Sequence, residues 1–150
     1  MQNYPMANSK FVTGTKSHDY PMASPEFITD LMPNEIFVFG SNDQGVHGKG
    51  AAKDALKFGA KWGVGQGRQG DTYAIPTKYT WRKPKPLKEI EMEVWKFLRY
   101  ASDHPEYIFL VTRVGCGYAG HMPSQIAPMF KEALELKNVL LPESFIQHLK

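Results

Sequence analysis

Two glycine-rich segments carry the residues best suited to binding chemistry. The first covers positions 40–50 and reads Gly-Ser-Asn-Asp-Gln-Gly-Val-His-Gly-Lys-Gly. Glycine lets the backbone approach a ligand with no Cβ in the way, and unpaired N–H groups at a helix start stabilise a phosphate. Lys49 adds a full positive charge. A flexible loop with structural glycines would have the same composition, so this segment alone does not decide between the two.

The second segment covers positions 115–121 and reads Gly-Cys-Gly-Tyr-Ala-Gly-His. Successive N–H groups in such a turn can form a concave nest for an anion. The first segment is neither a Walker A motif nor a dinucleotide fingerprint, since its glycines are spaced differently and Lys49 is not followed by Ser or Thr. This disfavours a nucleoside triphosphatase and a nicotinamide dehydrogenase. Two such segments at one sheet edge would clasp a diphosphate from both sides.

Three side chains of the first segment are candidates for chemistry on a bound ligand. The Asn42 carboxamide both donates and accepts, so it suits ribose hydroxyls or a water molecule, or else it bonds its own backbone in a turn. The His47 imidazole can act as a general acid or base near neutrality, or merely contact a phosphate. Asp43 can orient a water molecule, although solvated aspartates are common in loops.

The second segment offers a thiol and an imidazole. Cys116 lies between two glycines, a setting that can activate a thiol, but the spacing places no base beside it, so we favour a packing role. His121 begins a helix, where it covers a phosphate or caps the helix in solvent. The five histidines and one cysteine show no metal-ligand spacing, so we expect neither a metal nor a cofactor.

A basic stretch surrounds a region rich in Gly and Pro. It contains Arg68, Lys78 and Arg82, together with Tyr79 and Trp81. Either aromatic ring could stack on a base, and the charges could equally form a solvated face. The sequence leaves both interpretations open.

The elements that must position these residues alternate between strands and helices. Short, dense apolar runs predict strands buried on both faces, as in parallel sheets; they lie at 36–39, 72–75, 107–112 and 139–141. Amphipathic spacing predicts helices at 51–58 and 87–101, a third ending near 136 with Pro128 in its first turn or at a kink, and a short one within 142–150. This alternation predicts a three-layer α/β/α fold with a mixed, largely parallel central sheet.

The order of elements also predicts where a ligand would bind. In such sheets ligands bind beyond the carboxyl ends of the strands, and the two glycine segments follow the strands at 36–39 and 107–112. Residues 1–34 are rich in proline and read as an irregular arm packed on the domain formed by 35–150. Within that arm, Ser24 to Leu31 could form a short helical turn.

The composition is that of one globular domain. The chain has 150 residues, of which 42% are hydrophobic and 22% charged. A net charge of +3 suits an anionic ligand but does not by itself argue for nucleic acid. A single cysteine and no long apolar run favour a cytoplasmic protein that neither is secreted nor binds a membrane.

The arrangement resembles the macrodomain family. In that family an asparagine loop, a glycine run and a helix of small residues follow one strand, as at 39–52 here. A later strand precedes a phosphate loop of alternating glycines, as at 114–120. The chain is also similar to a group of small phage and bacterial proteins with Gly-Ser-Asn and Gly-Cys-Gly motifs. The resemblance spans roughly 35–141, although His47 and Lys49 interrupt the glycine run and no early aspartate for adenine is evident.

The resemblance implies binding of ADP-ribose or an ADP-ribose-derived nucleotide, by a reader of ADP-ribosylated targets or by a sequestering protein. Similarity to the phage proteins adds the option of a phage-encoded protein that acts on a host signal in the host cytoplasm. The macrodomain resemblance also favours Asn42 as a ribose contact. The alternatives are a hydrolase of ADP-ribosyl or terminal phosphate bonds, with catalysis by Asn42, His47 and Asp43, and a nucleic-acid-binding accessory protein. The expected ligand contacts are Gly40, Ser41, Asn42, Gly45, Val46, His47, Gly48, Lys49, Gly50, Gly115, Cys116, Gly117, Tyr118, Ala119, Gly120 and His121.

Overall fold

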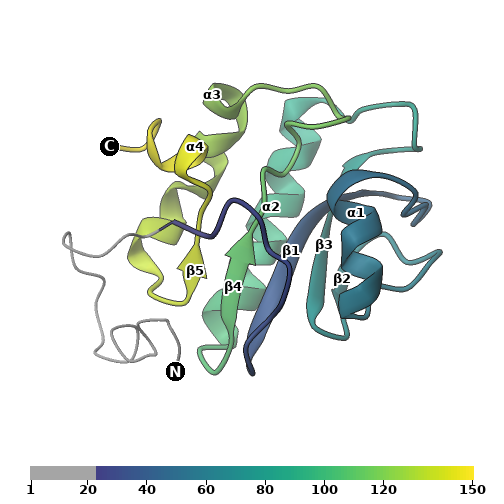
Figure 1. Cartoon of the computed structure of the whole chain (residues 1–150). Helices are drawn as coiled ribbons and strands as arrows, with labels where there is room; N and C mark the ends of the chain where they lie inside the picture. The colour runs from purple at the N-terminus through teal and green to yellow at the C-terminus, as the bar shows by residue number, and fades with distance from the viewer. Residues whose placement is uncertain (1–22) are drawn as a thin grey trace.

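The structure, a computed structural model, describes residues 23–150 and places five strands in one sheet (Figure 1). Strand β1 (Glu35–Asn42) is central and pairs in parallel with β3 (Thr72–Lys78) and β4 (Ile108–Val111). Strand β5 (Val139–Leu140) continues the parallel part beside β4, whereas β2 (Gly67–Gln69) pairs antiparallel to β3. The predicted α/β fold with a mixed, largely parallel sheet is therefore confirmed.

The central strand is buried on both faces. Ile36 and Val38 belong to one hydrophobic cluster, and Phe37 and Phe39 belong to the other. All four side chains are at most 2% exposed. Because successive side chains of a strand point to opposite faces, a strand between two cores has no polar face, which explains its continuous apolar run.

Helices cover both faces of the sheet (Figure 1). The elements outside the sheet are α1 (Gly50–Ala55), the 3-10 helix η2 (Leu56–Phe58), α2 (Leu87–Asp103), α3 (Pro123–Ile126), the 3-10 helix η3 (Ala127–Glu135) and α4 (Glu143–Ile146). The long helix α2 buries Ile90, Val94 and Phe97 in the cluster that contains Ile36. On the opposite face, α1 contributes its alanines to the cluster around Phe37.

Local sequence signals explain where two of these elements begin and end. Gly59 follows η2 with a φ of 110°, a left-handed conformation that suits glycine, and this confirms it as the stop of the predicted helix 51–58. Pro128 lies in the first turn of η3, where it costs no internal hydrogen bond. The helical segment therefore begins anew at Ala127.

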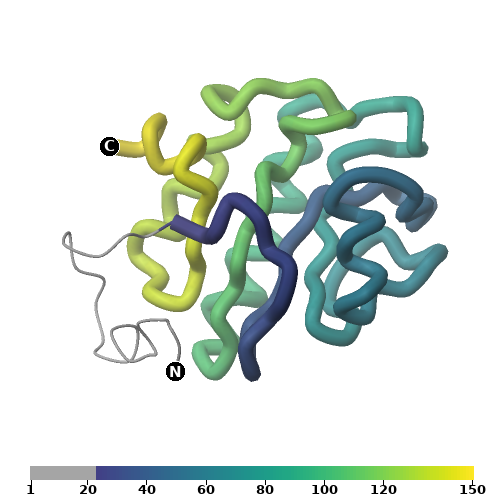
Figure 2. Tube along the Cα trace, viewed as in Figure 1, coloured from purple at the N-terminus to yellow at the C-terminus, as the bar shows by residue number. Residues whose placement is uncertain are grey.

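The register of the sheet brings the two glycine segments together. Val38 of β1 lies opposite Val111, the last residue of β4, so β1 continues four residues beyond β4 to Asn42. The segment that follows β4 therefore lies against the last residues of β1. Figure 2 shows the chain leaving β1 and β4 at the same end of the sheet.

Two features differ from the sequence prediction. The sequence predicts a loop where strand β2 lies, because the three residues of β2 contain no apolar side chain. The structure forms a strand there through backbone pairing with β3. No helical turn forms between Ser24 and Leu31. Instead Ala23 bridges Leu141, and the Ser24 hydroxyl donates to the Val111 carbonyl over 2.7 Å.

The part of the arm that can be described lies against the domain. Ile28 and Leu31 pack against the cluster around Phe37, while the expectations for residues 1–22 lie outside the described residues. Among residues 23–150, no helix combines the length and the apolar character that a membrane span requires.

Candidate functional site

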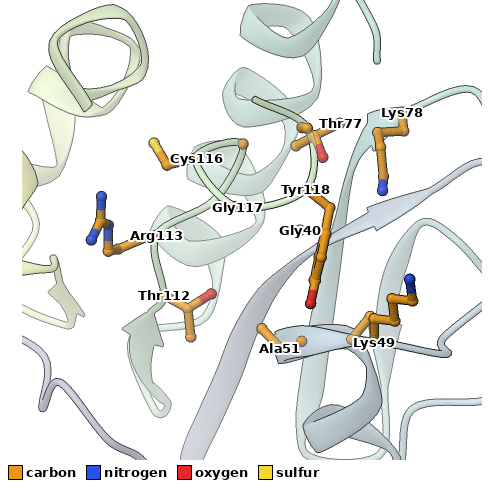
Figure 3. A pocket seen from close by; sticks show the side chains of 14 residues that line it. Gly40, Lys49, Ala51, Thr77, Lys78, Thr112, Arg113, Cys116, Gly117 and Tyr118 are labelled. Carbon is orange, nitrogen blue, oxygen red and sulfur yellow. The ribbon is translucent and has the colours of Figure 1, made fainter. Parts of the chain in front are cut away.

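A pocket of about 330 Å³ opens at the carboxyl ends of β1, β3 and β4 (Figure 3). We call it the phosphate pocket. It lies between the start of α1 and the loop that follows β4. Its lining residues are Gly40, Lys49, Gly50, Ala51, Ala52, Thr77, Lys78, Thr112, Arg113, Gly115, Cys116, Gly117, Tyr118 and Ala119. The two glycine segments thus share one pocket at the sheet edge where the sequence places a ligand.

Glycines make the close approaches around this pocket. A Cβ on Gly40 would lie 3.4 Å from the backbone nitrogen of Gly115. A Cβ on Gly50, whose φ is +61°, would lie 3.1 Å from the Tyr118 ring. Gly117 differs from both, because a Cβ there would meet nothing within 4 Å. The backbone of Gly117 therefore borders open space in the pocket.

Backbone N–H groups on both sides of the pocket lack partners. Among residues 23–150, no hydrogen-bond acceptor serves the N–H groups of Gly117, Tyr118 and Ala119, or those of positions 50–52 across the pocket. All six residues line the pocket. Convergent backbone N–H groups form a concave site for an anion.

Two lysines add positive charge at the same place. The Nζ atoms of Lys49 and Lys78 each lie 5.6 Å from the centroid of the Tyr118 ring, and both side chains extend toward the same part of the pocket (Figure 3). Burial, and secondarily the neighbouring Lys49 ammonium, lowers the pKa of Lys78. Within the described chain neither ammonium has a carboxylate within 4.0 Å. An anion placed here would relieve an unfavourable concentration of charge.

Arg113 and Cys116 lie on the other side of the loop from Tyr118 (Figure 3). Burial raises the pKa of the Cys116 thiol, and the thiol donates to the Val114 carbonyl over 3.5 Å. A raised pKa keeps the sulfur protonated at neutral pH, so Cys116 is a poor nucleophile. The packing role favoured from the sequence agrees with this environment.

His47 does not line the phosphate pocket. Its side chain is fully buried, and Nε2 donates to the carbonyls of Lys61 and Val64 over 2.9 and 3.1 Å. The ring also packs edge-on against Phe39 and Trp62. The imidazole of His47, expected from the sequence to contact the ligand or act in catalysis, instead joins the first glycine segment to the segment 61–64 and does not border the phosphate pocket.

The other two candidates for catalysis are also engaged outside the phosphate pocket. Asn42 is 3% exposed, and its carboxamide donates to and accepts from the backbone of Val46, each over 3.0 Å. This is the turn role considered from the sequence. Asp43 forms an ion pair with the buried Lys85 over 2.9 Å. The buried Ser41 hydroxyl donates to the Gly65 carbonyl.

The remaining expected contacts are divided among other places. Gly45 packs against another loop, since a Cβ there would lie 2.3 Å from the backbone of Gly63. The Nε2 atom of His121 donates to the Lys85 carbonyl over 3.1 Å. Neither these residues nor Gly120 lines the phosphate pocket. Val46 and Gly48 line a neighbouring pocket.

Several lining residues were not expected from the sequence. Thr77 ends a buried stretch of β3, and Thr112 and Arg113 directly follow β4. The sequence indicates Lys78 only as part of a basic stretch. The available signal was position, because each of these residues lies at the carboxyl end of a strand that borders β1.

No known family model, no curated protein and no solved structure matches this chain. Within the described part of the chain, no group of three or more His, Cys, Asp or Glu side chains could hold a metal ion.

Proposed function

We propose that the protein binds ADP-ribose or a related nucleotide diphosphate, with the phosphates held in the phosphate pocket. The macrodomain-like order of elements and loops supports this choice of ligand. The observation that carries the proposal is the convergence of unbonded N–H groups of Gly117, Tyr118 and Ala119 with the ammonium groups of Lys49 and Lys78. Charge-assisted hydrogen bonds from such donors suit phosphate oxygens.

Binding without turnover is the form of the proposal that the contacts favour. Asn42, Asp43 and His47 are each held by protein groups away from the phosphate pocket. A general acid or base must come within hydrogen-bond reach of the reacting atoms. The protein would thus act as a reader or sequestering protein for its ligand.

Gly117→Val tests the proposal directly. The added side chain has room in the folded protein and no left-handed φ to oppose it, so it fills the phosphate pocket without straining the fold. Calorimetric titration with ADP-ribose should show binding to the wild type and at least a tenfold loss in the variant, with unchanged thermal unfolding. In a parallel titration with pyrophosphate, which occupies the phosphate pocket alone, Gly48→Val is the matched control and should bind as the wild type does, since a Cβ there also meets nothing within 4 Å but lies outside the phosphate pocket.

Two results would count against this function. A folded Gly117→Val protein that retains full affinity would place the ligand elsewhere. Chromatography of the recovered ligand separates binding from turnover, because quantitative conversion of ADP-ribose by the wild type would make the protein an enzyme.

A further inference from the structure

A second pocket of about 610 Å³ adjoins the phosphate pocket. It is lined by Val46, Gly48, Lys49, Trp81, Arg82 and Tyr118, and we call it the aromatic pocket. Lys49 and Tyr118 line both pockets. A ligand whose phosphates lie among the unbonded N–H groups can therefore extend past Tyr118 into the aromatic pocket.

The aromatic pocket presents two half-exposed rings, each with a cation over it. Trp81 is 51% exposed and Tyr118 is 66% exposed. The Arg82 guanidinium lies 4.5 Å from the Trp81 ring centroid, and the Lys49 ammonium lies 5.6 Å from that of Tyr118. Exposed aromatic faces with adjacent cations are suited to stacking a nucleobase whose phosphate chain is anionic.

The Trp81 platform is held in place by its own turn. The Lys78 ammonium donates to the Trp81 carbonyl over 3.1 Å. The backbone N–H groups of Arg82 and Lys83 each donate to the Thr80 hydroxyl over 3.2 Å, and Tyr79 N–H donates to the Lys83 carbonyl. Because the backbone that carries the Trp81 ring is already fixed, less conformational entropy is lost when a ligand stacks on that ring.

The lining contains two side chains that could donate to the edge of a base, Arg82 and Lys49, but each of these cations lies over an aromatic ring, that of Trp81 or Tyr118. None of the six residues carries a carboxylate or carboxamide, the groups that pair with base amino and ring nitrogens. Stacking alone is tolerant of base identity, because every base has a π-face. The aromatic pocket thus supplies affinity for a base without strong selection among bases.

We infer that the aromatic pocket stacks the base of a nucleotide diphosphate whose phosphates lie in the phosphate pocket, and that it accepts adenine, guanine, uracil and cytosine alike. The inference rests on the proposed function, since the phosphates determine where the base can reach. It sets the ligand class as nucleoside diphosphates and their sugar conjugates, rather than adenine compounds alone.

The test compares calorimetric affinities for pyrophosphate, ADP, GDP, UDP and CDP. The four nucleotides should bind within about fivefold of one another, and each should bind roughly 5- to 150-fold more tightly than pyrophosphate, the usual contribution of one stacked base. Trp81→Ala should reduce nucleotide affinity toward that of pyrophosphate and leave pyrophosphate binding unchanged. Trp95→Ala is the matched control, because Trp95 is 54% exposed and lies beside Arg99 on α2, outside both pockets.

Fluorescence locates the base independently. In a Trp62→Phe, Trp95→Phe protein the remaining tryptophan is Trp81, and saturating ADP should quench its emission whereas pyrophosphate should not. Unchanged emission with ADP bound would overturn the inference, as would ADP affinity that survives Trp81→Ala.

The outcomes separate the two proposals. Pyrophosphate binding with no added affinity from a base would overturn the stacking inference and leave the proposed function standing. Absence of pyrophosphate binding, together with nucleotide affinity that Gly117→Val leaves intact, would overturn both. Tighter binding of an eight-nucleotide single-stranded RNA than of ADP would also contradict the inference, because it would assign the aromatic pocket to a polynucleotide.

Discussion

Replacing Lys78 by Met should weaken ligand binding without lowering the stability of the free protein. The substitution keeps much of the apolar stem but removes the ammonium that faces Tyr118 beside Lys49. A hydrogen bond from a charged donor contributes about 1.5–3 kcal/mol. Loss of one such bond to a phosphate should therefore weaken binding of ADP or ADP-ribose by about 10- to 150-fold.

The free protein should not lose stability in the same variant. Burial and repulsion from Lys49 both disfavour the charged form of Lys78 and lower its pKa. Met removes these costs, while the lost hydrogen bond to the exposed Trp81 carbonyl is worth only about 0.5–1.5 kcal/mol and water can replace it. We expect the free energy of unfolding without ligand to be unchanged within about 1 kcal/mol or to increase.

Calorimetry for affinity and urea unfolding for stability measure the two effects separately. Lys57→Met is the control, since its ammonium also lies over an aromatic ring, 5.1 Å from Phe58, yet Lys57 lines neither pocket. Its affinity should match that of the wild type. Undiminished affinity in Lys78→Met, or a loss of several kcal/mol in unfolding without ligand, would refute the reasoning that this ammonium serves the ligand rather than the fold.

Three further predictions concern the fold. Burial raises the pKa of Glu35 from 4.5 to about 7, so the folded state holds this proton more tightly than the unfolded state. The contribution of this proton to stability should be full below pH 4.5 and fall by up to about 3 kcal/mol as pH rises through 7. Urea unfolding of the wild type should therefore show a free energy of unfolding that decreases with pH over this range, and Glu35→Gln should remove that decrease. An equal decrease in Glu35→Gln would assign the pH dependence to other groups. Gly65→Ala should lower the free energy of unfolding by several kcal/mol, because a Cβ there would lie 2.0 Å from the Asn42 carbonyl oxygen. Gly48→Ala, whose Cβ would meet nothing within 4 Å, should leave it unchanged, and equal urea midpoints for the two variants would contradict this. His47→Ala should lower the free energy of unfolding by about 3 kcal/mol or more but leave the pyrophosphate affinity of the folded protein unchanged. Loss of pyrophosphate affinity without loss of stability would show that His47 contacts the ligand.

The sheet could be predicted because its strands are buried on both faces. The runs at 36–39, 72–75 and 107–112 are apolar for that reason, and they pair in one sheet as expected. Strand β2 could not be predicted, since Gly67, Arg68 and Gln69 are held by backbone pairing to β3 and carry no pattern of burial.

The site could be predicted in part. A glycine in a sequence signals a close approach, but not whether a ligand or another segment of backbone makes that approach. Gly117 borders open space in the phosphate pocket, whereas Gly45 is required by the backbone of Gly63. His47 looked available for chemistry because the segment that buries it, 61–64, is brought over it only by tertiary structure.

The most direct test of the central claim is a titration that observes the backbone N–H groups of the phosphate pocket. Amide NMR signals of ¹⁵N-labelled protein should be followed on addition of ADP-ribose. The signals of Gly117, Tyr118 and Ala119, and those of 50–52, should shift together and saturate at one equivalent, because these groups acquire phosphate oxygens as acceptors. Saturating ADP-ribose that leaves these amide signals in place, or moves a different set, would contradict the account.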